Sequence, residues 1–143
     1  MKLIPIKETI EENQEFNNPL HKEILEMTVD FYKRIGFVPP WICYFVELNG
    51  EIVGSAGIKG KPVDGKIEIA AMEAFRHQGI ATKICRELVQ LSLKTDPTIT
   101  ITARTLPENN VSAKVLKKNN FACTRMVNDP EDGDVWEWEY QKK

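Results

Sequence analysis

The sequence lacks the features that mark membrane-spanning and nucleic-acid-binding proteins. No stretch of its 143 residues approaches the roughly 20 apolar residues that a membrane helix needs. The apolar start at residues 3–6 is too short for a signal peptide. Basic charge is not in excess, because 19 Lys and Arg stand against 21 Asp and Glu. Since non-specific nucleic-acid binding depends on clustered Lys and Arg, we expect no nucleic-acid partner. Without a signal peptide or membrane helix, we also expect a cytoplasmic protein with no membrane partner.

Cysteine is also scarce. The three cysteines, Cys43, Cys85 and Cys123, are odd in number and widely spaced. This pattern matches neither a disulfide framework nor a paired zinc signature, so we expect no metal site. Free cysteine usually packs as a small apolar side chain, and each of the three is therefore predicted to be a buried thiol.

What is present is the composition of an ordinary folded domain. Hydrophobic residues make up 42% of the chain and charged residues 28%, far from the composition of disordered proteins. The length suits one domain with a sizeable core, and no repeat or Pro/Gly-rich linker divides it. Residues 1–143 are predicted to form a single domain.

Apolar spacing predicts ten elements in the order strand, helix, three strands, helix, strand, helix and two strands. The first helix is indicated by a stripe at spacings of three and four that ends before Gly36: Leu20, Ile24, Met27, Phe31 and Ile35. Asn49-Gly50 between two apolar runs predicts a hairpin whose turn needs positive φ at both residues. Later helices are expected near 80–94 and 111–116. The fold class is α/β (α+β), with one central sheet.

The segment over residues 68–82 runs from a strand through a short loop into a helix. The first N–H groups of a helix have no intrahelical partner and favour an anion. Gly79 allows close backbone approach, Ala81 keeps the next turn narrow and Arg76 adds a positive charge. These features predict a diphosphate cradle that matches neither a Walker loop nor a dinucleotide fingerprint. The alternative is a glycine that only makes a turn.

Two motifs carry a resemblance to a known family. Arg76-x-x-Gly79-x-Ala81 resembles the Gln/Arg-x-x-Gly-x-Gly/Ala motif of the GNAT acyltransferases. Residues 106–121 resemble the second signature of that family, in the branch of the ribosomal-protein-alanine N-acetyltransferases. The matching positions in this signature are Asn109, Ser112, Val115, Leu116, Lys118 and Phe121. Asn120 stands where the family has glycine, and asparagine tolerates the left-handed conformation of a helix C-cap.

The resemblance implies a GNAT fold with a mixed, mostly antiparallel sheet, flanked by helices, whose fourth and fifth strands splay apart around acetyl-CoA. The family's activity is transfer of an acetyl group to a primary amine, on a protein N-terminus or a small molecule, by direct attack in a ternary complex. The implied cofactor-binding residues are Ala71, Met72, Glu73, Arg76, His77, Gln78, Gly79, Ile80, Ala81, Thr82, Asn109 and Ser112.

The resemblance leaves the acid and base open. Many family members place a proton-donating tyrosine where this chain has Leu116. Ser112 is the candidate substitute, and the alternative is a hydroxyl bonded to nearby backbone. Glu68 is a candidate base or a residue on a solvated strand face, and Glu73 is a candidate base acting through water or a cap of the loop.

Three functions remain open at this stage. The first is the acetyltransferase, and the second is a catalytically silent module that binds CoA. The third is a phosphate-binding domain for another nucleotide, which depends on the loop alone. No pattern in the sequence identifies the acceptor amine, and a sheet edge at the C-terminus could support a homodimer.

Overall fold

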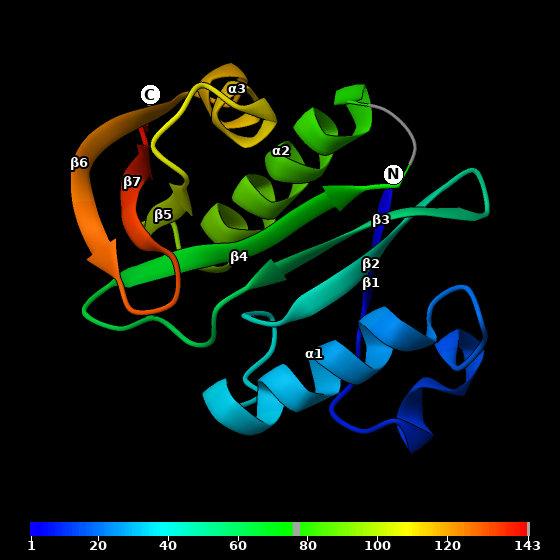
Figure 1. Cartoon of the computed structure of the whole chain (residues 1–143). Helices are drawn as coiled ribbons and strands as arrows, with labels where there is room; N and C mark the ends of the chain where they lie inside the picture. The colour runs from blue at the N-terminus through cyan, green and yellow to red at the C-terminus, as the bar shows by residue number, and fades with distance from the viewer. Residues whose placement is uncertain (76–77, 143) are drawn as a thin grey trace.

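The computed structural model describes residues 1–75 and 78–142, and it contains the ten predicted elements in the predicted order. A 3₁₀ helix, η1, is added after the first strand (Figure 1). The elements are β1 (Lys2–Pro5), η1 (Glu11–Phe16), α1 (Lys22–Ile35), β2 (Cys43–Leu48), β3 (Glu51–Ile58), β4 (Lys66–Ala74), α2 (Gln78–Thr95), β5 (Thr100–Thr105), α3 (Val111–Lys118), β6 (Phe121–Asp129) and β7 (Gly133–Tyr140).

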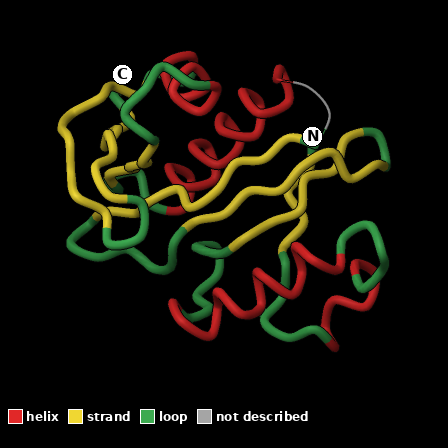
Figure 2. The backbone as a smooth tube through the Cα atoms, in the orientation of Figure 1, coloured by secondary structure: helices red, strands yellow, loops and turns green. Residues whose placement is uncertain are grey.

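The strands form one sheet of seven in the order β1-β2-β3-β4-β5-β7-β6. The β4–β5 pair is parallel, and the other neighbouring pairs in the described chain are antiparallel. Helix α1 lies on one face of the sheet, and α2 and α3 lie on the other (Figures 1 and 2). The mixed, mostly antiparallel sheet flanked by helices is thus confirmed. Within the described residues, no helix combines the length and apolarity needed to span a bilayer.

Strands β4 and β5 pair over only half of β4. Their register runs from Lys66 opposite Thr100 to Ile69 opposite Ala103, and it stops there. The Thr102 hydroxyl donates to the Ile67 carbonyl oxygen at 2.8 Å and fastens the closed half. Beyond this point β4 continues to Ala74 along β3, while β5 continues along β7. The predicted splay of the fourth and fifth strands is therefore present.

A β-bulge interrupts β4 where the two strands part. Gly57 of β3 pairs with Ala71 and Ile58 pairs with Ile69, so Ala70 is an extra residue in β4. A bulge kinks its strand and changes which face the later side chains point to. The alternation of buried Ile67 and Ile69 with more exposed neighbours therefore stops at Ala70. As a result, Ala70 and Glu73 line the same cavity although they are three residues apart.

The apolar face of α1 differs from the predicted stripe. The buried side chains of the helix are Leu25, Thr28, Val29 and Tyr32. Leu20 precedes the helix and is 85% exposed, and Met27 within it is 65% exposed. Part of the predicted core stripe is therefore wrong. The helix has two apolar sides: the side that carries Leu25 and Val29 is buried in the core, and the adjacent side, with Ile24 and Phe31, is only partly buried against it.

Local turn chemistry agrees with the sequence. Asn49 and Gly50 have φ values of 53° and 80° between β2 and β3, as the predicted hairpin requires. Asn120 has a φ of 66° just after α3, so asparagine adopts the left-handed conformation where the family has glycine. Both predictions are confirmed.

Gly54 in β3 offers a test of how closely α2 packs on the sheet. A Cβ there would lie 2.8 Å from Cδ1 of Ile84 in α2 and would also contact the Glu73 carbonyl oxygen. Backbone cannot yield as a flexible side chain does, so Gly54→Ala should lower the free energy of unfolding by about 1–3 kcal/mol. Chemical denaturation measures this change. Gly79→Ala is the control, because a Cβ at Gly79 meets nothing within 4 Å. Equal stability of the two variants would contradict this packing.

Candidate functional site

The parting of β4 from β5 leaves one edge of β4 without a strand partner. Residues 71–74 pair with β3 on one side, but the β5 register has ended at Ile69. Backbone N–H and C=O groups need partners wherever water is excluded. An extended ligand with amide groups can supply them by lying along this edge as an added strand. Met72 and Glu73, two of the predicted cofactor residues, belong to this free edge.

Helix α2 begins just beyond the tip of β4 (Figure 1). Its first N–H groups have no intrahelical acceptor, and the helix dipole favours an anion at this end. Gly79 is exposed, with open space where a Cβ would be. Ile80 and Ala81 are buried, so they hold the first turn against the core. The arrangement suits a phosphate group.

Helix α3 is capped by the asparagine that precedes it, and the Ser112 hydroxyl takes no part in the cap. The side chain of Asn110 accepts a hydrogen bond from the N–H of Ala113 at 2.9 Å. Ser112 is exposed, and its hydroxyl has no partner among the residues that the structure describes. It lies in a cavity of about 320 Å³ whose lining is Arg104, Thr105, Leu106, Asn110, Ser112, Asp132 and Val135. Ser112 therefore has a free hydroxyl at this cavity.

Two asparagines connect α3 to its surroundings. The Asn119 amide donates to the Thr82 carbonyl oxygen at 3.1 Å and so ties the end of α3 to the first turns of α2. Asn109 is exposed and accepts a hydrogen bond from the Lys117 ammonium group at 3.2 Å. Asn109 lies just before α3, and Thr82 lies in the second turn of α2. The family resemblance implies that both residues bind the cofactor.

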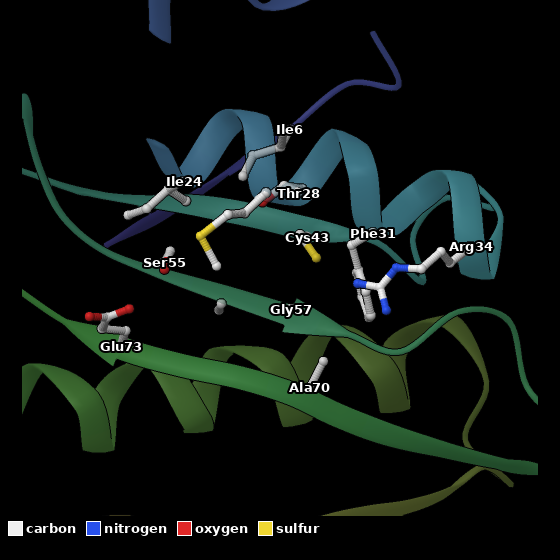
Figure 3. A pocket seen from close by; sticks show the side chains of 12 residues that line it. Ile6, Ile24, Thr28, Phe31, Arg34, Cys43, Ser55, Gly57, Ala70 and Glu73 are labelled. Carbon is white, nitrogen blue, oxygen red and sulfur yellow. The ribbon is translucent and has the colours of Figure 1, made fainter. Parts of the chain in front are cut away.

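A second cavity lies between α1 and the sheet (Figure 3). Its volume is about 270 Å³, near the lower end of the range for small-molecule sites. Most of its lining is apolar and comes from α1 and from strands β2 to β4. The lining residues are Ile6, Ile24, Met27, Thr28, Phe31, Arg34, Cys43, Ser55, Ala56, Gly57, Ala70 and Glu73. From α1 the cavity is lined by the buried Thr28, the partly buried Ile24 and Phe31, and the exposed Met27 and Arg34.

The cavity contains one acidic and one basic side chain among its lining residues. Glu73 comes from the free half of β4 and is exposed. Arg34 comes from the last turn of α1, and its guanidinium lies 5.5 Å from the centre of the Phe31 ring. Figure 3 shows Glu73 and Arg34 at opposite ends of the cavity. The site is therefore an apolar slot with opposite charges at its ends.

A buried tyrosine holds α1 at a fixed distance from the sheet. The Tyr32 hydroxyl donates to the Ile6 carbonyl oxygen at 2.7 Å and accepts from the Cys43 N–H at 2.9 Å. Burial holds the pKa of Tyr32 well above its usual range, so the hydroxyl stays protonated. Because Ile6 and Cys43 also line the cavity, this contact sets the position of its walls.

Glu68, the other candidate base, lies in an ion-pair cluster. Its carboxylate is 3.7 Å from Nε of Arg104, and Arg104 also pairs with Asp129 at 3.0 Å and Glu137 at 3.5 Å. These acids raise the pKa of Arg104 against the opposing effect of burial. Glu68 does not belong to the lining of the α1 cavity. The structure thus gives Glu68 a cationic partner rather than the solvated face considered from the sequence.

The predicted site residues are only partly brought together. Glu73 and Ser112 line different cavities. Arg76 and His77 lie outside the described residues, as do the side chains of Ala71 and Gln78. Within the described part of the chain, no cluster of His, Cys, Asp or Glu could hold a metal.

Sequence analysis missed the α1 side of the site. Ile24, Met27, Phe31 and Arg34 recur at spacings of three and four, and the set ends on a charge. A row of helix residues that packs in a core rarely includes a charged residue. Arg34 was therefore the signal in the sequence that this side of α1 is not a core face.

A family model described as an acetyltransferase (GNAT) domain matches residues 9–122, well over half of the chain. The chain therefore belongs to the GNAT acetyltransferases. This confirms the predicted class of enzyme, an acyltransferase that uses acetyl-CoA. A comparison with curated protein sequences finds no match.

Solved structures with this fold include three acetyltransferases with stated ligands or substrates. The aminoglycoside enzyme AAC(6')-Ib, in complex with ribostamycin and coenzyme A, is 26% identical with a TM-score of 0.60. The match covers 71% of this chain and 64% of that chain, so this chain spans less than two thirds of the length of AAC(6')-Ib. N-acetyltransferase PseH of Campylobacter jejuni, in complex with acetyl coenzyme A, is 16% identical with a TM-score of 0.70, over 99% of both chains.

The third is the ribosomal-protein-S18-alanine N-acetyltransferase of Escherichia coli, at 11% identity and a TM-score of 0.60, over 81% of this chain and 75% of that one. It belongs to the branch that the second motif indicated. Identities this low show the fold alone. The cytoplasmic location, the homodimer and the individual site residues stay predictions.

The cysteines supply a solution test of the burial described here. Cys43 and Cys85 are buried, but Cys123 is exposed on β6, so the prediction of three buried thiols is wrong for Cys123. Burial raises the pKa of Cys43 to about 11 and that of Cys85 to about 12, which leaves almost no thiolate near neutral pH.

A thiol reagent such as dithionitrobenzoate should therefore titrate one thiol in the folded protein and all three in denaturant. Cys123→Ser should abolish the native reaction. Rapid modification of Cys85, which is fully buried in α2, would contradict this burial.

Proposed function

We propose that this chain transfers the acetyl group of acetyl-CoA to a primary amine held in the α1 cavity, by direct attack in a ternary complex. One observation carries the proposal: the free half of β4 borders two spaces at once. Its unpaired edge faces the gap beside β5, and Glu73 lines the cavity under α1. A thioester along the edge and an amine in the cavity would then meet at the same strand.

The cofactor side would be held mostly by backbone. The pantetheine arm would hydrogen-bond to the main chain of Ala71, Met72 and Glu73, and the pyrophosphate would lie at the first turn of α2, around Gly79. Arg76, His77, Gln78, Ile80, Ala81 and Thr82 complete this proposed set. Asn109 and Ser112 would approach the arm from the start of α3. The exposed Gly79 and the free strand edge support this assignment.

On the acceptor side, Glu73 is the proposed base. An amine attacks only in its neutral form, so a proton must leave the ammonium group before or during attack. Glu73 takes this first proton through water. As the new C–N bond forms and the C–S bond breaks, the nitrogen loses a second proton to solvent. Glu73 is favoured over Glu68 because Glu73 lines the cavity, while Glu68 pairs with Arg104.

The leaving thiolate of CoA needs at most a weak acid. Leu116 occupies the position of the usual tyrosine, and its aliphatic side chain, buried at 1% exposure, has no proton to donate. The free hydroxyl of Ser112 is the proposed donor of a hydrogen bond to the sulfur, and solvent supplies the proton. A thiol has a pKa near 8.5, so the thiolate leaves readily even with modest help.

The cofactor site is tested by Gly79→Glu. The added carboxylate would extend into open space, so the fold should survive, but it would repel a pyrophosphate at the same place. Calorimetric titration of acetyl-CoA should show micromolar binding to the native protein and none to the variant. Gly79→Gln has the same size without the charge and should lose less affinity.

Equal binding by the native protein and Gly79→Glu would contradict this cofactor site. If acetyl-CoA binds but no amine causes release of CoA thiol, the chain is the silent CoA-binding module. ATP that displaces acetyl-CoA would instead indicate a site for another nucleotide.

The base is tested by Glu73→Gln. The variant should lose on the order of 10²-fold in kcat at neutral pH, where the acceptor is mostly protonated. The loss should shrink as the pH rises towards the amine pKa of about 10, because hydroxide then removes the proton without the carboxylate. Rates of CoA thiol release across pH measure both effects. If Glu68→Gln shows this profile and Glu73→Gln does not, the assignment is reversed.

A further inference from the structure

We propose that the acceptor is a small amphipathic amine with an anionic group at its far end, and that Arg34 is the residue that selects this group. The inference rests on the proposed acetyl transfer and names the substrate class of the same cavity. It follows from three properties of the cavity: an apolar middle, opposite charges at its ends, and a cation that the fold leaves without a partner.

The middle of the cavity favours an apolar linker. Figure 3 shows Cys43 between Glu73 and Arg34, and Phe31 beside Arg34; the lining also includes Met27 and Ala56. Met27 is 65% exposed although it is one of the more apolar side chains of α1, so it has surface to bury against a ligand. Removing such surface from water stabilises a complex by about 25 cal/mol per Å². A strongly hydrated acceptor, such as a sugar, would give up much of its hydration here, because between the two charged ends the lining offers the hydroxyls of only Thr28 and Ser55 in exchange.

Arg34 is the charged cavity residue to which the proposed acetyl transfer gives no role. Within residues 1–75 and 78–142 it makes no ion pair or hydrogen bond, and its described contact is the Phe31 ring at 5.5 Å. Stacking on a ring holds one face of the guanidinium and leaves its edges free to donate. A guanidinium edge binds carboxylate or phosphate oxygens in pairs. The ring therefore orients Arg34 as a ready anion receptor at the mouth of the cavity.

The dimensions limit the length of the acceptor. Ile24 lies at the end with Glu73, and Arg34 lies ten residues further along α1. At 1.5 Å per residue these two positions are about 15 Å apart along the helix. The cavity volume of about 270 Å³ leaves room for a small molecule rather than a long peptide. The charge arrangement matches an amine beside Glu73 and an anion beside Arg34.

The opposing possibilities make different demands on these charges. A polyamine would bring a second cation to Arg34 and be repelled. A simple alkylamine would leave Arg34 unused and would not depend on it. A protein N-terminus carries no fixed anion at the required distance. Only an amine with a distal anionic group uses both ends of the cavity.

The test compares three series of acceptors at matched chain lengths: linear ω-amino acids, alkylamines and diamines. Release of CoA thiol gives kcat and KM for each compound. Each compound is also titrated calorimetrically into the protein saturated with CoA, so acceptor binding is scored even where no turnover occurs. We expect the amino acids to exceed the alkylamines by at least about tenfold in kcat/KM, through KM.

Three variants assign this preference to Arg34. Arg34→Gln should remove it by raising KM for the amino acids, with little change for the alkylamines. Arg34→Glu should shift the preference to the diamines. Lys33→Gln is the matched control, since Lys33 is the neighbouring exposed cation in the last turn of α1 but does not line the cavity. Acetyl-CoA binding should be unchanged in all three, which shows that they are folded.

The outcomes separate this inference from the proposed function. The inference is overturned if alkylamines or diamines are acetylated as fast as the amino acids, or if Arg34→Gln still prefers the amino acids. Either result leaves acetyl transfer intact. A different result is that the native protein binds the amino acids, Arg34→Gln does not bind them, and no amine causes release of CoA. This result supports the anion site and overturns the proposed function. Neither binding nor turnover of any series overturns both.

Discussion

The loss of the β4–β5 pairing after Ile69 is the constraint on which the rest of the site depends. Thr102 keeps the first half of the pair closed through its bond to the Ile67 carbonyl oxygen. Beyond it, β5 follows β7, and the Trp138 indole donates to the Thr105 hydroxyl at 2.9 Å and holds it there. On its β5 side, the backbone of β4 therefore loses its strand partner in the middle of the sheet, where N–H and C=O groups need partners.

The bulge at Ala70 gives the free half of β4 two functions. It turns Glu73 towards the cavity under α1, while the backbone edge of the same residues remains directed at the gap beside β5. Since a ligand at that edge would be bound by main-chain groups, the side chains of the strand can vary without loss of the cofactor site. In the proposed reaction the acceptor side instead depends on individual side chains, so the substrate would be chosen there.

Helix α1 explains how a core element also becomes a substrate wall. Leu25 and Val29 face the core, and Tyr32 fixes the helix to β1 and β2 by hydrogen bonds to backbone. With the helix held in this way, its adjacent side packs only partly against the core and also lines the cavity. Met27 and Phe31 lie on that side, and the apolar character that would stabilise a core is available to a ligand.

Local sequence signals determined the order of the elements, the Asn49-Gly50 turn and the left-handed Asn120, because each depends on neighbours a few residues away. The motifs around Gly79 and Ser112 also identified the family. Tertiary structure alone decided which side of α1 is buried, that Glu68 pairs with Arg104, and that Arg34 and Glu73 share a cavity. These facts depend on where a helix crosses a sheet and where a strand bulges, and both are set by packing between distant segments.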